Sequence, residues 1–338
     1  MSSMSALDRL AVPGARHWGR LPGRPADADP LAEFTGLGRR LRRLRLKEWV
    51  GFTLLHPELA SSVIIQDAQY LSSSEFYLFD RAAGLLHQHS ATSHGGAPAL
   101  PTVLLEGVCH FQRRGYRISY SFAESSGRHR VEVDLAATTK APAITGALTL
   151  DAAAATAPLS VSSRLPGGRM YTYKAAFPVA GTLRVGGRAF TFDPSRDLAI
   201  LDEHRSLLPY RTSWLWGTFA SLGAGGLVGA NFAARPELPG EPEESCLWTP
   251  GTCEPLADIA FAPGSADPMA PWHISSADGR LDVAFEPQGR KRVIRQLGLF
   301  AIDYYQLFGH YTGTVRGASR TFELSGAPGV CESMKARL

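Results

Sequence analysis

Apolar and polar residues alternate one by one along many short stretches of this chain, and this alternation constrains its fold more than any other feature. One such stretch carries Tyr116, Ile118, Tyr120 and Phe122 in alternation with Arg117, Ser119 and Ser121. The same period of two recurs in 131–135, 144–150 and 281–286. Successive side chains of a β-strand point to opposite faces, so the pattern is typical of strands with one face in a core and the other toward water.

Turn signals separate these stretches. Gly186-Gly187 lies between the apolar runs 183–185 and 188–192, which is a hairpin signature. We find no long amphipathic helical pattern in the body of the chain. Many short strands joined by glycine and proline turns predict an all-β protein of the sandwich or barrel type. The 44% of hydrophobic residues is enough for a core.

The length of 338 residues allows two domains. Residues 1–36 contain four prolines and are interpreted as an irregular leader. Farther on, Trp49-Val50-Gly51-Phe52 precedes an apolar strand at 62–67, and Trp214-Leu215-Trp216-Gly217 precedes another at 226–232. This loose parallel predicts two like halves meeting near 178–182. We therefore expect one β-domain at 37–180 and a second at 181–338.

The charge of the chain points to no single partner. A net charge of +4 over this length is a weak bias, and we expect no nucleic acid to bind. The densest basic run extends from Arg39 to Lys47. One interpretation is contact with an anionic membrane surface or an acidic partner. The other is a solvated strand or short helix with its apolar residues turned inward.

Four cysteines are present, and none forms a C-x-x-C pair. Reduced thiols in a cytoplasmic protein are the favoured interpretation, and a Cys246–Cys253 clip in a surface loop is the alternative. No segment has the roughly 18 consecutive apolar residues of a membrane span, and the N-terminus lacks an apolar signal core. The sequence gives no indication of the oligomeric state.

The richest cluster of chemical groups falls within residues 202–216. Asp202, Glu203 and His204 are the candidate catalytic proton donors and acceptors. The candidate ligand-binding residues of this segment are Tyr210, Arg211, Trp214 and Trp216. Trp214 and Trp216 share one face of a strand, where two indoles form a wall for an apolar ligand or a cation. The alternative is core packing by the tryptophans and a satisfied ion-pair cluster around the acids.

A second cluster lies in residues 303–313. Tyr304 and His310 share one face of the expected strand, Tyr311 lies on the other, and all three are candidate ligand contacts. A structural histidine among aromatics is the alternative. Lys174, in the aromatic strand 171–174, is either a buried amine with a shifted pKa or a side chain that extends to water.

Several well-known motifs are absent from the sequence. It contains no dinucleotide or phosphate-loop fingerprint, no G-x-S-x-G elbow and no H-E-x-x-H pair. The histidines are scattered, so their spacing defines no metal site. We therefore expect no cofactor and no metal.

The order of several motifs resembles a family known only as a domain of unknown function. The motifs are Lys47-Glu48-Trp49, Phe76 to Asp80, Tyr173-Lys174, Pro178 to Gly181, Asp202 to Arg205, Pro209 to Thr212, Trp214, Trp216, Phe308-Gly309, Tyr311, Gly313 and Gly329 to Glu332. That family is distantly similar to the hydroxyneurosporene synthase (carotenoid hydratase) and AttH-like group. The resemblance implies two lipocalin-like, or calycin-like, antiparallel β-barrel or half-barrel domains. It also implies that Asp202, His204, Tyr210, Trp214 and Trp216 are positions for protonating an alkene and sheltering the cation, although an Asp-His-x-Trp run is missing here.

The sequence thus predicts a protein that binds a hydrophobic small molecule, isoprenoid or lipid-like, in a β-barrel cavity. Acid-catalysed hydratase, isomerase or cyclase chemistry without a cofactor is one form of this hypothesis. The alternative is a non-catalytic lipid-binding protein or a structural protein at a membrane surface. Whether the chain is an enzyme stays open at this point.

Overall fold

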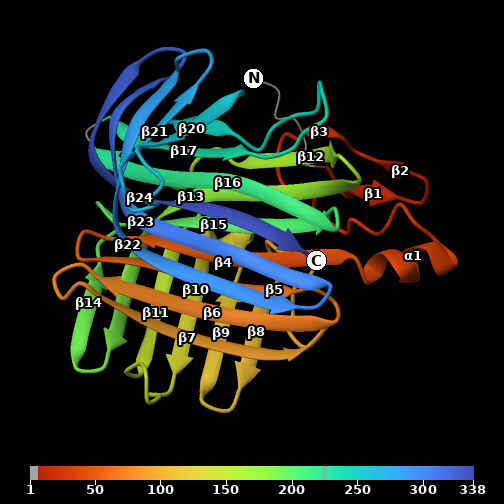
Figure 1. Ribbon diagram of the computed structural model, residues 1–338, viewed down its shortest axis with the longest axis horizontal. Helices are drawn as coiled ribbons and strands as arrows, with labels where there is room; N and C mark the ends of the chain where they lie inside the picture. Colours follow the sequence, from red (N-terminus) through yellow and green to blue (C-terminus); the bar gives the residue numbers. More distant parts are fainter. Residues whose placement is uncertain (1–6, 224) are drawn as a thin grey trace.

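The computed structural model describes residues 7–223 and 225–338, which are built almost entirely of β-strands (Figure 1). The described residues contain one α-helix, α1 (Gly36–Arg43), and one 3₁₀ turn, η1 (Glu124–Ser126). The all-β class predicted from the period-two alternation is confirmed.

The first sheet has thirteen strands and forms a nearly closed barrel. Its strands are β3 (Gly19–Arg20), β4 (Leu46–Leu55), β5 (Leu59–Asp67), β6 (Leu71–Asp80), β7 (Leu85–His94), β8 (Val108–Arg113), β9 (Tyr116–Ser121), β10 (Arg128–Leu135), β11 (Ile144–Asp151), β12 (Leu159–Leu165), β13 (Gly168–Val185), β14 (Arg188–Phe192) and β15 (Leu198–Leu207). The main path runs β7-β6-β5-β4-β15-β13-β11-β10-β9-β8, with β12 and β14 beside β13. The short strands β1 (Ala11–Val12) and β2 (Ala15–Arg16) pair separately.

The second sheet has nine strands in the order β19-β18-β17-β16-β24-β23-β22-β21-β20 and forms a half-barrel. These strands are β16 (Arg211–Gly223), β17 (Gly226–Ala234), β18 (Cys246–Thr249), β19 (Thr252–Pro255), β20 (Ile259–Pro263), β21 (Trp272–Ser276), β22 (Leu281–Leu297), β23 (Phe300–Arg316) and β24 (Thr321–Arg337). The long strands β22–β24 extend across the outside of the first sheet in Figure 1.

The strand β13 bends in the region where the sequence suggested a domain boundary. Its first part pairs with β15, and its second part pairs with β11 and β14. Gly181, with a φ of 132°, lies at this change, and a Cβ there would be 2.2 Å from the backbone oxygen of Ala147. The glycine therefore serves a bend within one strand. The division at residue 180 stays a prediction about folding units, but the sheets themselves divide between Leu207 and Arg211.

Each sheet has its own hydrophobic core on one face. Val50 and Phe52 of β4 point into the barrel core, and Phe219 and Leu307 point into the half-barrel core. Because strand side chains alternate, the residues between them face the other sheet. Two further clusters, which include Leu159 with Trp248 and Phe79 with Phe308, pack the sheets together.

Residues 7–35 contain the short strands β1, β2 and β3 between irregular segments, and they pack against the barrel. Leu10 and Ala28 belong to the barrel core. Arg24 is buried and donates through Nε and Nη2 to both carboxylate oxygens of Glu203, at 2.6 and 2.8 Å. The leader is thus held by a buried ion pair to β15.

The basic run forms the helix α1 and the start of β4. The interpretation that its apolar residues turn inward is wrong for Leu41 and Leu44, which are 59% and 58% exposed, although Leu46 is buried. The helix touches the body through its arginines instead, which leaves the leucines outside. In the described part of the chain, no helix has the length and apolar character needed to cross a membrane.

Candidate functional site

A cavity of about 250 Å³ lies between the two sheets. Residues of both sheets line it, and apart from Phe52 they are outside the two hydrophobic cores. The sequence predicts a ligand cavity inside a barrel. The barrel interior is instead filled by large side chains such as Phe52, Phe111 and Tyr120. An engineered cavity of ~150 Å³ binds benzene, so 250 Å³ corresponds to roughly ten carbon atoms by proportion.

Strand register builds the first wall of the cavity. Across β13, β15, β4, β5 and β6, one row of directly paired residues consists of Lys174, Asp202, Gly51, Ile64 and Glu75. Two residues along, the next row contains His204, Trp49, Gln66 and Ser73. All of these residues line the cavity. Residues two apart on a strand share a face, which explains why both rows point the same way.

The second wall is built in the same manner from β16, β24, β23 and β22. One row contains Trp216, Glu332, Gln306 and Lys291, and the next contains Trp214, Met334, Tyr304 and Val293. Every member of these two rows also lines the cavity. Lys291 forms an ion pair with Glu75 of the first wall, and Tyr77 donates a hydrogen bond to Gln306. These contacts join the two walls.

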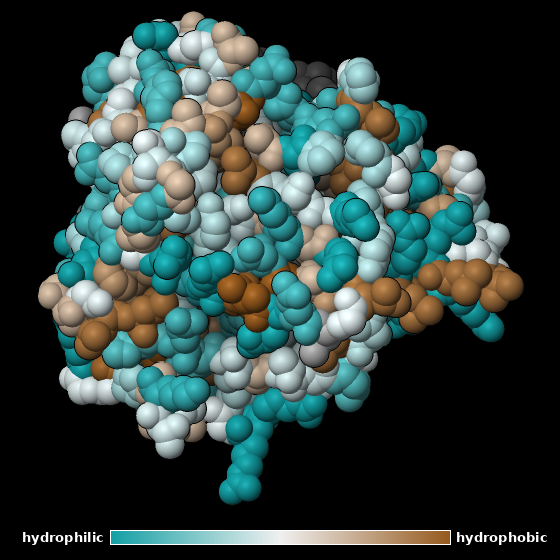
Figure 2. Space-filling model, viewed as in Figure 1, coloured by the Kyte–Doolittle hydropathy of each residue, from teal (hydrophilic) through white to brown (hydrophobic). Residues whose placement is uncertain are grey.

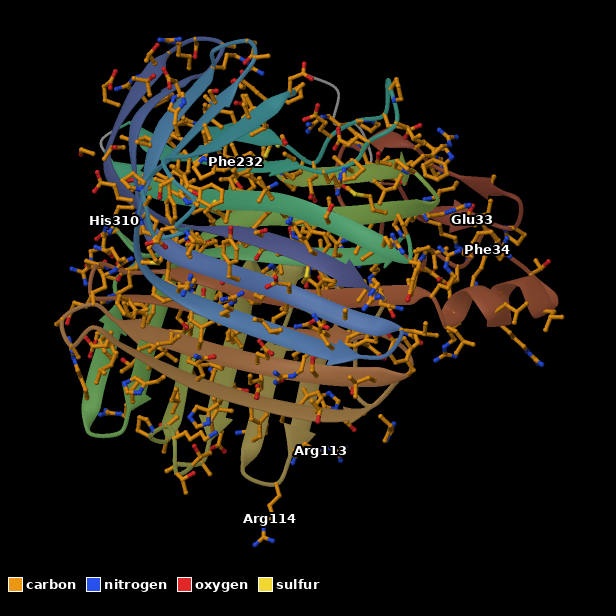
Figure 3. All side chains as sticks on the ribbon, viewed as in Figure 1. Glu33, Phe34, Arg113, Arg114, Phe232 and His310 are labelled. Carbon is orange, nitrogen blue, oxygen red and sulfur yellow. The ribbon has the colours of Figure 1, made fainter. Side chains whose placement is uncertain are left out.

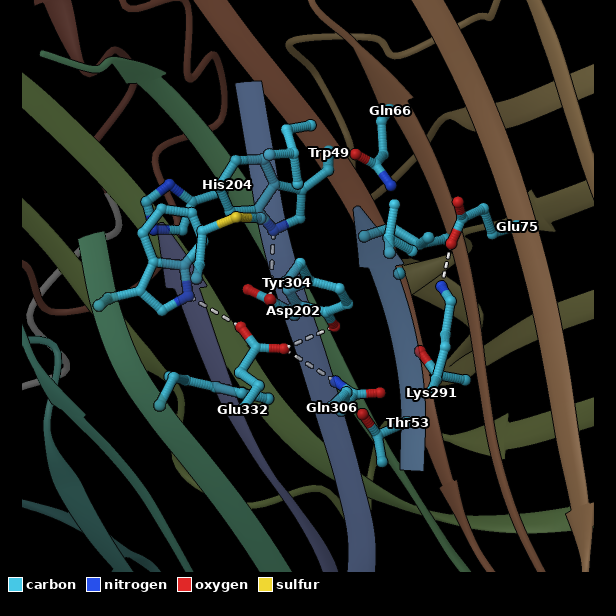
Figure 4. A pocket seen from close by; sticks show the side chains of 18 of the residues that line it. Trp49, Thr53, Gln66, Glu75, Asp202, His204, Lys291, Tyr304, Gln306 and Glu332 are labelled. Carbon is cyan, nitrogen blue, oxygen red and sulfur yellow. Dashed lines mark hydrogen bonds and ion pairs between the residues drawn. The ribbon is translucent and has the colours of Figure 1, made fainter. Parts of the chain in front are cut away.

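Three aromatic rings are stacked at one side of the cavity (Figure 4). The Trp49 ring lies 4.4 Å from the His204 ring and 6.5 Å from the Trp214 ring, nearly parallel to both. The His204 ring nitrogens contact Ser206 at 2.7 Å and Glu244 at 3.4 Å. Burial acts to raise the pKa of Glu244, but the charge of Arg235 and neighbouring cations keep it below its usual value. His204 therefore lies between an indole and an ionised carboxylate.

Asp202 carries the charged contacts of the first wall. The Lys174 Nζ lies 2.5 Å from Asp202 Oδ1, and the Trp49 indole donates to Oδ2 at 3.2 Å. The lysine side chain is 2% exposed, whereas that of Asp202 is 25% exposed. The Lys174 ammonium also lies 5.0 Å from the ring centre of Trp216. Asp202 is thus an anchored carboxylate with an accessible side.

Glu332 carries the acid group of the second wall. Its carboxyl oxygens accept hydrogen bonds from Trp214 Nε1 at 2.9 Å, Tyr304 Oη at 2.8 Å and Gln306 Nε2 at 2.9 Å (Figure 4). Burial raises the pKa of Glu332, and the charge of Asp202 raises it further, in spite of these donors. Burial also raises the pKa of Tyr304, with the neighbouring Glu332 adding to the shift. Glu332 therefore holds its proton to higher pH than an ordinary glutamate does.

Asp202, His204, Trp214, Trp216 and Tyr304 are the sequence candidates that line the cavity. Among the three acid–base candidates, only Glu203 is absent from this lining. Neighbouring strand residues face opposite ways, and its side chain is fully buried toward the barrel, where Arg24 and Arg205 bind it. We therefore assign Glu203 a structural position.

The remaining ligand-binding candidates do not line the cavity. Tyr210 and Arg211 are exposed at the junction of the two sheets. Tyr311 is fully buried in the half-barrel core, where its hydroxyl donates to the Val330 oxygen at 2.7 Å. His310 is half-buried near the left edge of Figure 3, and burial, with the charge of Arg81, lowers its pKa. His310 shares a face of β23 with Tyr304 but lies six residues farther along the strand, outside the cavity lining, whereas Tyr311 lies on the opposite face, in the half-barrel core.

Several residues of the site were not selected from the sequence. Trp49 was noted only within the internal parallel and the resemblance motifs, Glu332 only within those motifs, and Gln306 was not selected. Lys174 was selected as a candidate buried amine, and it is buried beside Asp202. Glu332 lies two residues from Met334 on a strand that pairs with β16. It can be recognised as a site residue only when this strand register is known.

Comparisons with known proteins identify the family. Residues 18–338 match the family described as "Domain of unknown function (DUF2804)", and the chain belongs to it. The family resemblance inferred from the sequence motifs is thereby confirmed. Among solved structures, the chain is similar to kievitone hydratase from Nectria haematococca, with 11% identity and a TM-score of 0.44. That similarity covers 97% of this chain and 98% of the hydratase chain. A search of curated proteins found no match.

Proposed function

We propose that the protein binds an apolar, unsaturated small molecule in the cavity between its sheets and catalyses proton-transfer chemistry on it. The reaction class is hydration or isomerisation of a carbon–carbon double bond. The observation that carries this proposal is the pair of carboxyl groups on opposite walls: Glu332 with a raised pKa, and Asp202 ion-paired to Lys174. Two carboxyl groups in different surroundings are the usual means of providing an acid and a base in one site.

The proposed binding mode follows from the lining of the cavity. Indole rings of Trp49, Trp214 and Trp216 supply large apolar faces, and Ile64 and Val293 add aliphatic surface. A few polar groups at fixed positions would orient the ligand, as in most small-molecule sites. The volume suits a molecule of roughly ten carbons, or part of a longer chain.

The proposed acid is Glu332, acting directly or through Tyr304. A hydroxyl group can donate and accept at once, so Tyr304 can receive the proton of Glu332 and donate its own toward the cavity. The developing positive charge on the substrate would lie among indole faces, and Trp gives the strongest cation–π attraction of the aromatic residues. The ionised Asp202 and Glu244 add negative potential on the same side.

The proposed base is Asp202. In hydration, it would take a proton from water while the water oxygen bonds to the substrate carbon and Glu332 supplies the other proton to the neighbouring carbon. The sum is addition of one water to the double bond. After the reaction Asp202 has gained one proton and Glu332 has lost one. Proton exchange with solvent returns both groups to their starting protonation states. In isomerisation, Asp202 would remove a proton from carbon instead of water.

A binding protein without catalysis is the second candidate. The observation that favours it is that both oxygens of Glu332 already accept hydrogen bonds, from three donors in all. These hydrogen bonds stabilise the buried carboxyl group of Glu332. They leave neither of its oxygens free to interact only with a ligand, as expected of a residue that serves the structure.

The test separates binding from turnover. Binding is measured with the fluorescent probe anilinonaphthalene sulfonate and its displacement by a panel of ten-carbon terpenes. Turnover is measured by incubating the protein with the same terpenes in ¹⁸O-labelled water or in deuterium oxide and following isotope incorporation by mass spectrometry. Hydration adds ¹⁸O, and isomerisation adds deuterium at carbon.

Two substitutions give the decisive comparison. Glu332→Gln and Asp202→Asn should retain probe binding within a few-fold and reduce isotope incorporation by at least 10²-fold, the usual weight of a general acid or base. The control is Glu323→Gln, an exposed glutamate on the same strand as Glu332. Terpene binding without incorporation in the wild type would favour the binding protein. No displacement of the probe by any terpene would contradict this choice of ligand class.

A further inference from the structure

The helix α1 is amphipathic, but its apolar face is turned away from the protein. Leu37 and Leu41 of α1 and its C-cap residue Leu44 are spaced by four and three residues, which places them on one side of the helix. They are 70%, 59% and 58% exposed. In Figure 2 an apolar surface extends along the projecting segment at the right, where Figure 1 shows α1. An ordinary surface helix turns this face to the core.

Arginines attach the other side of the helix to the body. Arg39 pairs with Asp29 at 2.6 Å, Arg42 lies 4.2 Å from the Phe34 ring, and Arg43 donates to Gln69 at 3.0 Å. The outward leucines are therefore a consequence of how the helix is held. Within the described residues, no acidic side chain forms an ion pair with Arg40, Arg42, Arg43 or Arg45.

More exposed apolar side chains surround the same end of the molecule. Tyr70, Leu71, Tyr210 and Leu299 are 45% to 81% exposed and share an apolar hollow with Phe300 and Leu338. We call Tyr70, Leu71, Tyr210 and Leu299 the apolar collar. It is joined to the helix region, because the Lys47 ammonium lies 4.9 Å from the Tyr70 ring and Arg45 donates to the Leu208 oxygen at 3.1 Å.

The apolar collar is next to the cavity between the sheets. Leu208 and Thr212, on either side of Tyr210 in the chain, both line the cavity, as does Ile302 beside the Leu299 turn. The apolar collar and α1 therefore lie on one continuous surface, and this surface borders the end of the cavity that Leu208, Thr212 and Ile302 line.

We propose that this end of the protein docks on an anionic lipid bilayer, with the leucines of α1 and the apolar collar in the interfacial layer. Helices with an apolar face and flanking arginines lie in the plane of a membrane interface in this way. The guanidinium group of Arg40 complements anionic headgroups, and the positive charges of Arg42, Arg43 and Arg45, which no acidic side chain of the described residues neutralises, add to the attraction. An apolar ligand could then pass from the bilayer into the cavity beside Tyr210. This ligand transfer rests on the function proposed above, whereas the docking on the bilayer does not.

A second copy of the chain fits this surface less well. A two-fold contact places the same patch of both copies together, so the arginines of the two α1 helices would meet. Like charges brought together in this way oppose association. An anionic surface has the opposite charge, and for this reason we assign the bilayer as the partner.

The test uses sucrose-loaded vesicles of phosphatidylcholine with 30% phosphatidylserine, and vesicles of phosphatidylcholine alone, in a sedimentation assay. The wild type should bind the anionic vesicles and lose binding as salt is raised toward about 0.5 M. The double variant Leu37→Ser/Leu41→Ser should lose at least 10-fold in partition coefficient. Arg40→Gln, which leaves the contacts that hold the helix in place, should lose about fivefold, since this is the contribution of one basic residue near the surface.

Matched controls come from exposed residues elsewhere. Leu85→Ser changes an exposed leucine at the β6–β7 turn, and Arg114→Gln changes the arginine at the tip of the β8–β9 hairpin in Figure 3. Both should bind vesicles as the wild type does. Equal binding by all variants, or none by the wild type, would overturn the docking surface. A dimer that Leu37→Ser/Leu41→Ser dissociates in light scattering, without vesicle binding, would also overturn it in favour of a second copy. Because the assay contains no cavity ligand, its failure leaves the proposed function untouched.

Discussion

Two neighbouring acids of β15 should differ in how much stability the protein loses when their charge is removed. Glu203 is fully buried, with its carboxylate bound by Arg24 at 2.6 Å and by Arg205 at 2.8 Å. The guanidinium of Arg205 also contacts Glu48, so four charges form one buried network. Glu203→Gln removes one negative charge and leaves two buried arginines with a single carboxylate between them. Breaking a buried ion pair in this manner costs about 3–5 kcal/mol.

Thermal unfolding followed by circular dichroism measures this loss. For a folding unit of roughly 200 residues, 3–5 kcal/mol corresponds to a decrease in Tm of roughly 6–20 °C. Asp202→Asn should lose less, about 1–2 kcal/mol, because the asparagine oxygen still accepts from Lys174 and the side chain borders the cavity. The exposed Glu323→Gln serves as the control, with a change within about 0.5 kcal/mol.

The pH dependence gives an independent check on the same network. Burial acts to raise the pKa of Glu203, but the charge of Arg24 keeps it below its usual value. A lowered pKa in the folded state contributes stability that is present above the unfolded value of about 4.3 and is lost as pH falls. The Tm difference between wild type and Glu203→Gln should therefore be largest near neutrality and shrink below about pH 4. An equal Tm for the two proteins at pH 7 would refute the assignment of Glu203 to a structural network.

Three further predictions concern the site and the bend of β13. Burial raises the pKa of Glu332, so its ionisation opposes folding above pH about 4.3. The Tm of Glu332→Gln minus the Tm of the wild type should therefore increase from pH 4 to pH 7. A decrease of this difference over the same range would contradict the raised pKa. Gly181→Ala should lower the free energy of unfolding by at least about 1–3 kcal/mol in urea titrations because of its positive φ and the close Ala147 oxygen, whereas Gly187→Ala, with open space at its Cβ, should be nearly neutral. Trp214→Phe should weaken binding of anilinonaphthalene sulfonate roughly 2- to 10-fold through the altered stack on Trp49, and Trp18→Phe, outside the cavity lining, should not change it.

The strands were predictable because alternation is a local property. Tyr116, Ile118 and Tyr120 are buried, as their spacing predicts, and the Gly186-Gly187 turn joins β13 to β14. The parallel between the segments at Trp49 and Trp214 also has a structural counterpart, since the two rings stack across the space between the sheets. The place where the sheets divide was not predictable from Gly181, because a glycine that allows a bend and one that ends a domain look alike in sequence.

The site was only partly predictable because it depends on which strands pair. Asp202, His204, Trp214 and Trp216 were found by their density in one segment. Glu332 is more than a hundred residues away in sequence and joins them only through the β16–β24 register. Strand alternation requires Asp202 and Glu203 to face opposite ways, but it does not indicate which of the two faces borders the cavity, and both were predicted as catalytic candidates. The cavity was expected in a barrel, whereas the face that carries Trp214 meets the other sheet.

We propose that the space between the two sheets, and not the interior of the barrel or of the half-barrel, receives an apolar ligand. The most direct measurement is a crystal structure of the protein with 2-bromonaphthalene, a ten-carbon bicycle, with data collected at the bromine absorption edge. We predict an anomalous bromine peak in the space bordered by Trp49, Trp214 and Glu332. A peak within the barrel core between Phe52 and Tyr120, or no peak in the cavity at a saturating concentration, would contradict the account.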